Sequence, residues 1–276
     1  MAFDLDLNLT KMPPMKRNHL WSGSSKIVAM LAIALLVLSA TPPRPQAPAI
    51  KNILLIHGVF ADGSGWQDVF KILTAKGYNV TVVQNPCNTL EDDVKAVKTA
   101  MDKETGPCIL VGHSYGGAVI TEAGSDDRVM GLVYVDGFVP DSGETAVAMD
   151  PSIPDLTNGA IIPDASGLIW LDKAKFHAAF CADLPAGLAE FMSAAQIPGT
   201  LKAFTTVITH APWKTKPCWG ILGTEDKSIN PILLRRQYQR ANAKVTEIVG
   251  ASHVSFISHP KEVAAVIDDA AQKSNK

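Results

Sequence analysis

A serine lies between two glycines at the point where an apolar run ends. The run CILV occupies residues 108–111, and the motif GHSYG that follows places Ser114 between Gly112 and Gly116. An ordinary turn without chemistry is one interpretation. The other is a nucleophile elbow, a tight and strained turn between a strand and a helix that holds the serine hydroxyl out for attack. Glycines two positions before and after the serine would remove side chains that collide there.

A serine hydroxyl is a poor nucleophile unless a base takes its proton. His253, in the sequence GASH, lies between the last expected strand and the last expected helix. Loops at the carboxyl ends of parallel strands share one edge of the sheet, so Ser114 and His253 are expected to meet. His113 is adjacent to the serine, but its side chain should point away from the Ser114 hydroxyl. His253 is therefore the predicted base.

A carboxylate must hold the base in the correct tautomer and stabilise the imidazolium that forms. Asp226 follows the apolar run of residues 218–222 and is expected at the same edge of the sheet as His253. A one-residue shift directs the neighbouring Glu225 elsewhere, and Asp136, after an earlier strand, is the reserve candidate. The resulting order along the chain, serine then aspartate then histidine, is the order associated with this elbow.

Two backbone amides are expected to stabilise the oxyanion that develops during acyl transfer. One is the amide of Tyr115, directly after the serine. The other belongs to the glycine-rich loop after the first strand, where His57-Gly58 turns the chain and directs the Val59 amide toward the site. Phe60 is the less favoured alternative in that loop.

Strand-like and helix-like segments alternate after residue 50. This succession predicts an α/β fold with a mainly parallel sheet of about six strands and helices on both faces. The pattern lapses between about Pro140 and Pro212, where Leu171–Phe180 and Leu188–Ala195 indicate a helical insertion. The expected strands are residues 52–56, 79–84, 108–111, 131–135, 218–222 and 245–249, and the expected helices are residues 64–76, 90–103, 115–123, 231–241 and 260–271.

The first fifty residues differ from the rest of the chain. Basic residues lead into the apolar run of residues 27–38, which ends in small residues, as in a secretory signal peptide. Residues 1–40 are therefore predicted to be a signal peptide, residues 41–49 a proline-rich linker and residues 50–276 the folded domain. The protein is expected to be exported, to the periplasm or the medium. An uncleaved signal that anchors it to a membrane is the alternative.

The overall charge gives no reason to expect a nucleic-acid partner, because the formal net charge is −2 at pH 7 and no extended basic tract appears. The spacing of the four cysteines matches no zinc site. Cys108 and Cys218 begin apolar strands, where buried free thiols are expected. Cys87 and Cys181 lie in less regular segments, and the sequence leaves open whether they form a disulfide.

Together these residues resemble the α/β-hydrolase family, in its serine esterase type. The likeness covers residues 51 to about 272, where the HG loop, GHSYGG, TEDKSINP and SHVSFISHP match the family's oxyanion loop, nucleophile, acid and histidine. The segment GFVPDSG, residues 137–143, looks like the start of the cap in plant methyl-ester esterases and hydroxynitrile lyases. The resemblance implies a cap over the pocket and no metal or organic cofactor.

Three functions are compatible with this set of residues. The first is a serine hydrolase that cleaves small carboxylic esters through an acyl-enzyme, with lactone or amide cleavage as a near variant. The second is a hydroxynitrile lyase-like reaction, in which Ser114 and His253 act as an acid–base pair beside a cationic residue. The third is a non-catalytic, ligand-binding relative. Candidates for the cationic residue are Lys173, Lys175, Lys202 and Lys214.

The insertion is expected to cover the pocket and to select the substrate. Its apolar side chains would favour a fairly small acyl or alkyl group, although such residues also serve as internal packing. The candidates for the lining are Trp170, Phe176, Phe180, Phe191, Met192 and Trp213.

Overall fold

The computed structural model describes residues 50–274 of the 276-residue chain. The predicted signal peptide, residues 1–40, and the predicted linker, residues 41–49, lie outside the described residues. Within the part that is described, no helix combines the length and the apolar character needed to cross a membrane.

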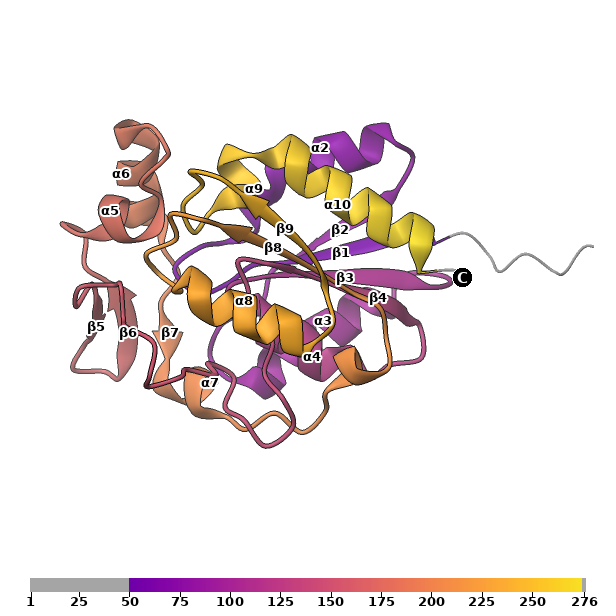
Figure 1. Ribbon diagram of the computed structural model, residues 1–276, viewed down its shortest axis with the longest axis horizontal. Helices are drawn as coiled ribbons and strands as arrows, with labels where there is room; N and C mark the ends of the chain where they lie inside the picture. The colour runs from indigo at the N-terminus through magenta and orange to yellow at the C-terminus, as the bar shows by residue number, and fades with distance from the viewer. Residues whose placement is uncertain (1–49, 275–276) are drawn as a thin grey trace, which may run out of the picture. The chain divides into compact units, whose positions relative to one another are not determined.

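Six parallel strands form the main sheet, in the spatial order β2-β1-β3-β4-β8-β9 (Figure 1). The sequence-based prediction of a parallel sheet of about six strands is thus confirmed. Every residue of β1 and β3 is buried, since helices cover both faces of the sheet there. The strands are β1 (Asn52–Ile56), β2 (Asn79–Val83), β3 (Cys108–His113), β4 (Val129–Val135), β8 (Cys218–Gly223) and β9 (Lys244–Ile248).

Five main helices flank the sheet. One face is covered by α2 (Gln67–Ala75) and α10 (Pro260–Lys273), and the other by α3 (Leu90–Met101), α4 (Gly116–Ala123) and α8 (Pro231–Arg240) (Figure 1). The bounds agree with the predicted helices to within a few residues. The predicted helix over residues 64–76 is divided into a short 3-10 turn, η1 (Gly63–Trp66), and α2. A four-residue helix, α9 (Ser255–Ser258), was not predicted.

Helix α3 begins with a strong N-terminal signal in the sequence. The Thr89 side chain accepts a hydrogen bond from the Asp92 amide at 3.0 Å, and three acidic residues in the first turn complement the helix dipole. The buried face of α3 consists of Leu90, Asp93, Val94, Val97 and Met101. Asp93 is therefore a carboxyl group on the face that packs against the sheet.

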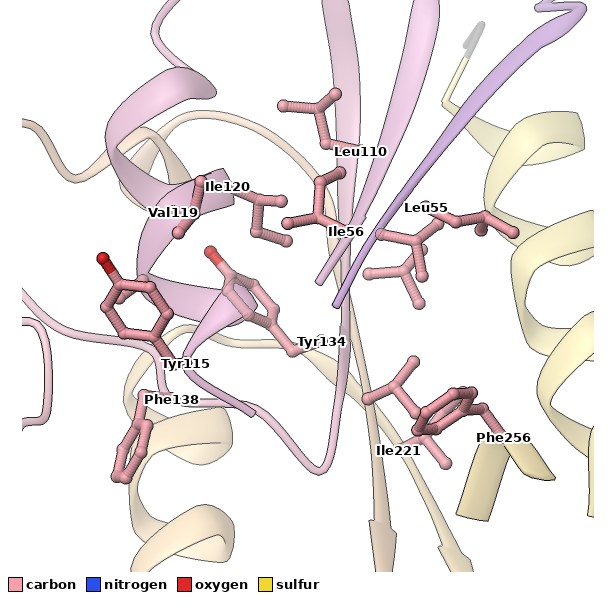
Figure 2. Close-up of a cluster of buried hydrophobic side chains, with 14 of the residues drawn as sticks. Leu55, Ile56, Leu110, Tyr115, Val119, Ile120, Tyr134, Phe138, Ile221 and Phe256 are labelled. Carbon is pink, nitrogen blue, oxygen red and sulfur yellow. The ribbon is translucent and has the colours of Figure 1, made fainter. Parts of the chain in front are cut away.

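The core lies on both sides of the sheet. Leu55 and Ile56 are consecutive in β1 and point to opposite faces, as the alternation of a strand requires (Figure 2). Leu55 projects toward the face that carries α10, whereas Ile56 projects toward Val119 and Ile120 of α4 (Figure 2). Both faces are therefore dry, and the strands have one stable register.

The register of the strands brings their carboxyl ends to one edge. Ile56 is paired with Gly112, His113 with Val135, and Gly223 with Ile248. The residues that follow β1, β3, β4, β8 and β9 consequently emerge side by side. All predicted site residues belong to these loops.

The insertion between β4 and β8, residues 140–212, is called the cap below. It contains helices as predicted, together with a small antiparallel sheet in the order β5-β6-β7 that was not predicted. In Figure 1 these elements lie beside the main sheet, at the left of the view. Its elements are β5 (Ile161–Pro163), β6 (Leu168–Leu171), α5 (Phe176–Phe180), α6 (Ala186–Ala195), β7 (Gly199–Thr200) and α7 (Leu201–Thr205).

The prediction of one helix over Leu171–Phe180 was wrong in its first half. Leu171 ends β6, and the helix begins only at Phe176. Leu171 is paired with Ile161 in the small sheet, and the next residues form a turn in which Asp172 accepts a hydrogen bond from the Ala174 amide at 2.9 Å. Aspartate favours such turns by bonding to the backbone just ahead of it.

All four cysteines are free and buried. The disulfide between Cys87 and Cys181 that the sequence left open is therefore absent, and the predicted free thiols at Cys108 and Cys218 are confirmed. Burial raises the pKa of Cys108, Cys181 and Cys218 to about 12 in each case.

The thiols give a direct test of the fold. We expect Ellman's reagent to find no rapidly reacting thiol in the native protein at neutral pH, because burial and the raised pKa keep the thiolate form scarce. In guanidinium without a reductant, all four cysteines should react. A count of two in guanidinium would mean that a disulfide is present and would contradict the structure.

Candidate active site

Ser114 lies in a strained turn between β3 and α4. Its φ is 54°, in the left-handed region that serine rarely adopts. Two backbone hydrogen bonds hold the turn: the Ser114 amide donates to the Val135 carbonyl at 3.2 Å, and the Gly117 amide donates to the Ser114 carbonyl at 2.9 Å. A Cβ atom on Gly112 would overlap the Gly116 backbone. The geometry is that of an elbow, not of a relaxed turn.

His253 and Asp226 form a buried pair. The two follow β9 and β8, and the His253 Nδ1 atom donates to Asp226 Oδ2 at 2.7 Å. Asp226 also accepts hydrogen bonds from the amides of Ser228 at 2.8 Å and Ile229 at 2.9 Å. Both side chains are almost fully excluded from water. With Nδ1 carrying the proton, Nε2 is the ring nitrogen left free to accept one.

Burial acts on both members of this pair. It lowers the pKa of His253, so the imidazole is neutral in the resting protein and can accept a proton. It raises the pKa of Asp226, whereas the amides of Ile229 and Ser228 stabilise the carboxylate and lower that pKa. The hydrogen bond between the two groups lets Asp226 hold the proton on Nδ1 and so fix the tautomer of His253.

His113, considered as the base, and Asp136, the reserve candidate for the acid, make other contacts in the structure. His113 donates through Nε2 to the His253 carbonyl at 3.0 Å and supports the loop of that histidine. Asp136 accepts from the Gly223 amide at 2.7 Å and the Ser255 hydroxyl at 2.5 Å. Burial and the charge of Asp226 raise the pKa of Asp136 well above its ordinary value. Neither residue replaces a member of the predicted triad.

The loop after β1 packs directly against the elbow. A Cβ atom on Gly58 would lie 2.6 Å from the Ser114 Cβ atom. The Phe60 amide donates to the Ile197 carbonyl at 2.8 Å, so it is engaged and is excluded as an oxyanion donor. Among the described residues, none accepts a hydrogen bond from the amide of Val59 or Tyr115. These two amides remain available for a substrate oxygen.

Ser114 and His253 line the same cavity, whose volume is about 410 Å³. No hydrogen bond joins the Ser114 hydroxyl to the His253 ring in this structure, although both residues are described. Such contacts are often long before a substrate binds. The rest of the lining is mostly apolar and comprises Val59, Phe60, Tyr115, Phe138, Val147, Met149, Asp155, Thr157, Gly159, Ile161, Leu171, Phe180, Phe204, Ser228 and Ile229.

Of the six residues predicted to line the pocket from the insertion and its end, only Phe180 does so. Phe191 and Met192 lie on a neighbouring hollow, and Phe176 packs against Phe180 with ring centroids 5.1 Å apart. Trp170 and Trp213 serve the internal structure of the cap region, because their indole nitrogens donate to Asp164 and to the Pro140 carbonyl.

Comparison with known proteins decides the family. The model of the alpha/beta hydrolase family matches residues 53–266, which is most of the chain. The chain belongs to the alpha/beta hydrolase family. The resemblance inferred from the motifs is thus confirmed.

Two named relatives of the chain are hydrolases. A carbendazim hydrolyzing esterase from Nocardioides sp. (strain SG-4G) is 31% identical over 183 residues, or 60% of this chain and 67% of the relative. A pyrethroid hydrolase from Sphingobium wenxiniae is 27% identical over 250 residues, or 80% of this chain and 87% of the relative. Both named relatives are hydrolases, which supports ester hydrolysis as the activity of this chain.

A solved structure supports the same hydrolase fold. The crystal structure of a pyrethroid hydrolase matches with a TM-score of 0.72 and 22% sequence identity, over 81% of this chain and 98% of that chain. At this level of identity the likeness concerns the fold alone.

Several residues of the hydrolase pocket escaped sequence-based reasoning. Ser228 and Ile229 line the cavity and also donate their amides to Asp226. Their position directly after the predicted acid was the available signal. Asp155 and Thr157 reach the cavity from an irregular part of the cap, and no motif marked them. Within residues 50–274, no group of three or more His, Cys, Asp or Glu side chains could hold a metal ion.

The close approach of Gly58 to the elbow leads to a prediction. Gly58→Ala should lower ester hydrolysis by at least about 10²-fold, because the added methyl group displaces either Ser114 or the Val59 amide. Hydrolysis of p-nitrophenyl acetate measures the loss, with circular dichroism as a check on folding.

Gly187→Ala is a matched control, because a Cβ atom there meets nothing within 4 Å. It lies in α6, where alanine is favoured over glycine by about 1 kcal/mol. Its activity should stay at the wild-type level. Full activity of Gly58→Ala would contradict the assigned geometry.

Proposed function

We propose that the protein cleaves small carboxylic esters through an acyl-enzyme, with Ser114 as nucleophile, His253 as base and Asp226 as the acid that orients it. One observation carries the proposal: the buried hydrogen bond of 2.7 Å between His253 and Asp226 lies at the cavity that Ser114 also lines. The Val59 and Tyr115 amides complete the proposed site as oxyanion donors.

The proposed reaction has two halves. Ser114 Oγ attacks the ester carbonyl while His253 Nε2 takes the hydroxyl proton, and the Val59 and Tyr115 amides bind the resulting oxyanion. His253 then gives the proton to the leaving alcohol, and the acyl group stays on Ser114. In the second half, water attacks this acyl-enzyme with His253 again as base, which releases the acid and restores the serine.

The cavity supports a small and largely apolar substrate. Its volume of about 410 Å³ is in the lower part of the range for ligand pockets, and most of its lining is apolar. The relatives named as a carbendazim hydrolyzing esterase and a pyrethroid hydrolase support hydrolysis as the reaction. We therefore expect esters with compact aryl or alkyl groups as substrates. Lactone or amide cleavage on the same triad is the near alternative.

A hydroxynitrile lyase-like reaction is disfavoured by the charges around the pocket. Among the described residues that line the cavity, none is lysine or arginine. Lys175 donates to the carbonyls of Asn158 and Gly159, and Lys214 pairs with Asp141. The complete Ser114, His253 and Asp226 set also argues against a non-catalytic binding protein.

Substitution of the triad gives the first test. Ser114→Ala and His253→Ala should each lower kcat for p-nitrophenyl acetate by about 10⁴-fold or more, and Asp226→Asn by up to about 10⁴-fold. A fluorophosphonate probe should label the wild type and fail to label Ser114→Ala. Ser125→Ala, on an exposed serine, is the control. Retained hydrolysis in Ser114→Ala would refute the nucleophile.

A trapping experiment separates the proposed hydrolase from a lyase. Rapid quenching during turnover of a slowly deacylating p-nitrophenyl ester should yield protein whose mass is increased by the acyl group, at the peptide that contains Ser114. A lyase on cyanohydrins forms no such adduct. Cyanide release from mandelonitrile without any acyl adduct from esters would favour the lyase instead.

A further inference from the structure

A buried carboxylate lies behind the proposed oxyanion hole, outside the triad. Asp93 of α3 has no exposed surface and forms no salt bridge among the described residues. Its two oxygens are nevertheless both occupied. Asp93 Oδ2 accepts from the Tyr115 hydroxyl at 2.8 Å, and Asp93 Oδ1 accepts from the Cys87 amide at 2.7 Å.

The first of these hydrogen bonds leads directly to one oxyanion donor. Tyr115 follows the proposed nucleophile and lines the cavity, and its phenol is held by Asp93. Its ring is almost fully buried, and the Phe204 ring lies 5.9 Å away. Because amide and phenol belong to one residue, fixing the phenol at Asp93 restricts how the Tyr115 backbone can rotate.

The second hydrogen bond leads to the other donor through the segment Asn85–Cys87. Cys87 has a φ of 56°, an unfavourable value for cysteine, and its amide is tied to Asp93. From this segment the Cys87 Sγ atom contacts the Gly58 carbonyl at 3.9 Å, and the Asn85 amide group donates to the His57 carbonyl at 3.3 Å.

The Gly58 carbonyl matters because it belongs to the same peptide unit as the Val59 N–H. A peptide unit is planar and trans, so its C=O and N–H point in opposite directions. The His57 ring donates to the Gly58 carbonyl at 2.8 Å, on the same side as Cys87. Holding the oxygen there directs the Val59 N–H the other way, away from Cys87.

We propose that Asp93 is a positioning residue that fixes both donors of the oxyanion hole, Tyr115 through its phenol and Val59 through Cys87 and the Gly58 carbonyl. The inference rests on the proposed hydrolase mechanism. Asp93 does not touch the substrate. Its effect is to hold two amides at a fixed separation before the tetrahedral intermediate forms, so that they need no reorganisation.

The energetics of Asp93 are consistent with a role beyond stability. Burial raises its pKa to about 6, against the lowering effect of the Tyr115 and Cys87 hydrogen bonds. An acid whose pKa is higher in the folded state makes the folded state bind protons more tightly, so its ionised form costs stability above that pKa. At neutral pH this carboxylate therefore opposes folding while it orders the loops.

Three variants test the inference. Tyr115→Phe removes only the phenol oxygen, and Asp93→Ala removes both acceptors. Asp93→Asn keeps one oxygen for the Cys87 amide and an NH₂ group that can donate to the Tyr115 oxygen. With kcat expressed per active site titrated by the fluorophosphonate, we expect losses of about 10-fold for Tyr115→Phe and about 10²-fold for Asp93→Ala. Asp93→Asn should restore most of the activity, and KM should change less than three-fold throughout.

Inhibition by a trifluoromethyl ketone adds a second measurement, its Ki, which a loss of stability alone would not change. The ketone adds to the nucleophilic serine and places an oxyanion in the hole, so its Ki should rise in parallel with the fall in kcat/KM. Tyr134→Phe is the matched control. It removes another buried phenol, which contacts Thr121 Oγ1 at 3.1 Å, and it should keep kcat and Ki unchanged.

The outcomes separate this inference from the function on which it rests. If the wild type hydrolyses esters and Tyr115→Phe and Asp93→Ala keep kcat per titrated site within two-fold, the positioning role is overturned and the hydrolase remains. The same holds if only the titratable fraction falls. Should Asp93→Ala fail to fold, Tyr115→Phe alone decides. A wild type without labelling at Ser114 would overturn the proposed mechanism, and this inference with it.

Discussion

The structure of the site depends on close backbone packing around Ser114. Gly58 approaches the Ser114 side chain, and a Cβ atom on Gly137 would lie 2.9 Å from the Gly112 carbonyl. The loops after β1, β3 and β4 can meet only because these positions carry no side chains. The strain of the elbow is maintained by the neighbouring strands, whose hydrogen bonds leave the turn at Ser114 no relaxed alternative. The same crowding brings the loop of Val59 against the elbow that carries Ser114 and Tyr115.

Much of this arrangement could be predicted from the sequence, because the segments that follow parallel strands all emerge at the same edge of the sheet. Short strand-like runs predicted all six strands, and the residues that follow each run then had to lie at one edge. This rule predicts Asp226 and His253 as partners, and their hydrogen bond agrees with the prediction. The exclusion of His113 as the base rests on its position. His113 ends β3 directly before Ser114, and its ring bonds to the His253 carbonyl, not to the Ser114 hydroxyl.

The cap could not be predicted in the same way. Its strands are two to four residues long, too short for periodicity to distinguish them from helix, and the turn at Asp164 depends on side-chain bonds to the backbone. The pocket lining consequently came largely from residues without a motif. Asp93 was missed for another reason. A carboxyl group on the apolar face of α3 was visible in the sequence, but only the tertiary structure shows that Tyr115 and Cys87 converge on it.

Three buried carboxylates order the loops of this site, and burial raises the pKa of each. Asp226 gathers the amides that follow β8 and holds the His253 ring, and Asp136 joins the end of β8 to Ser255 in the histidine loop. Asp93 accepts hydrogen bonds from the Tyr115 phenol and the Cys87 amide, close to the proposed oxyanion donors. Each ionised group is disfavoured by the dry environment that surrounds it. Each of them accepts at least one backbone N–H, and the amides bound by Asp226 and Asp93 belong to segments outside the strands and helices. These hydrogen bonds tie the loops of the site to one another through buried carboxylates, each of which must be desolvated to make them.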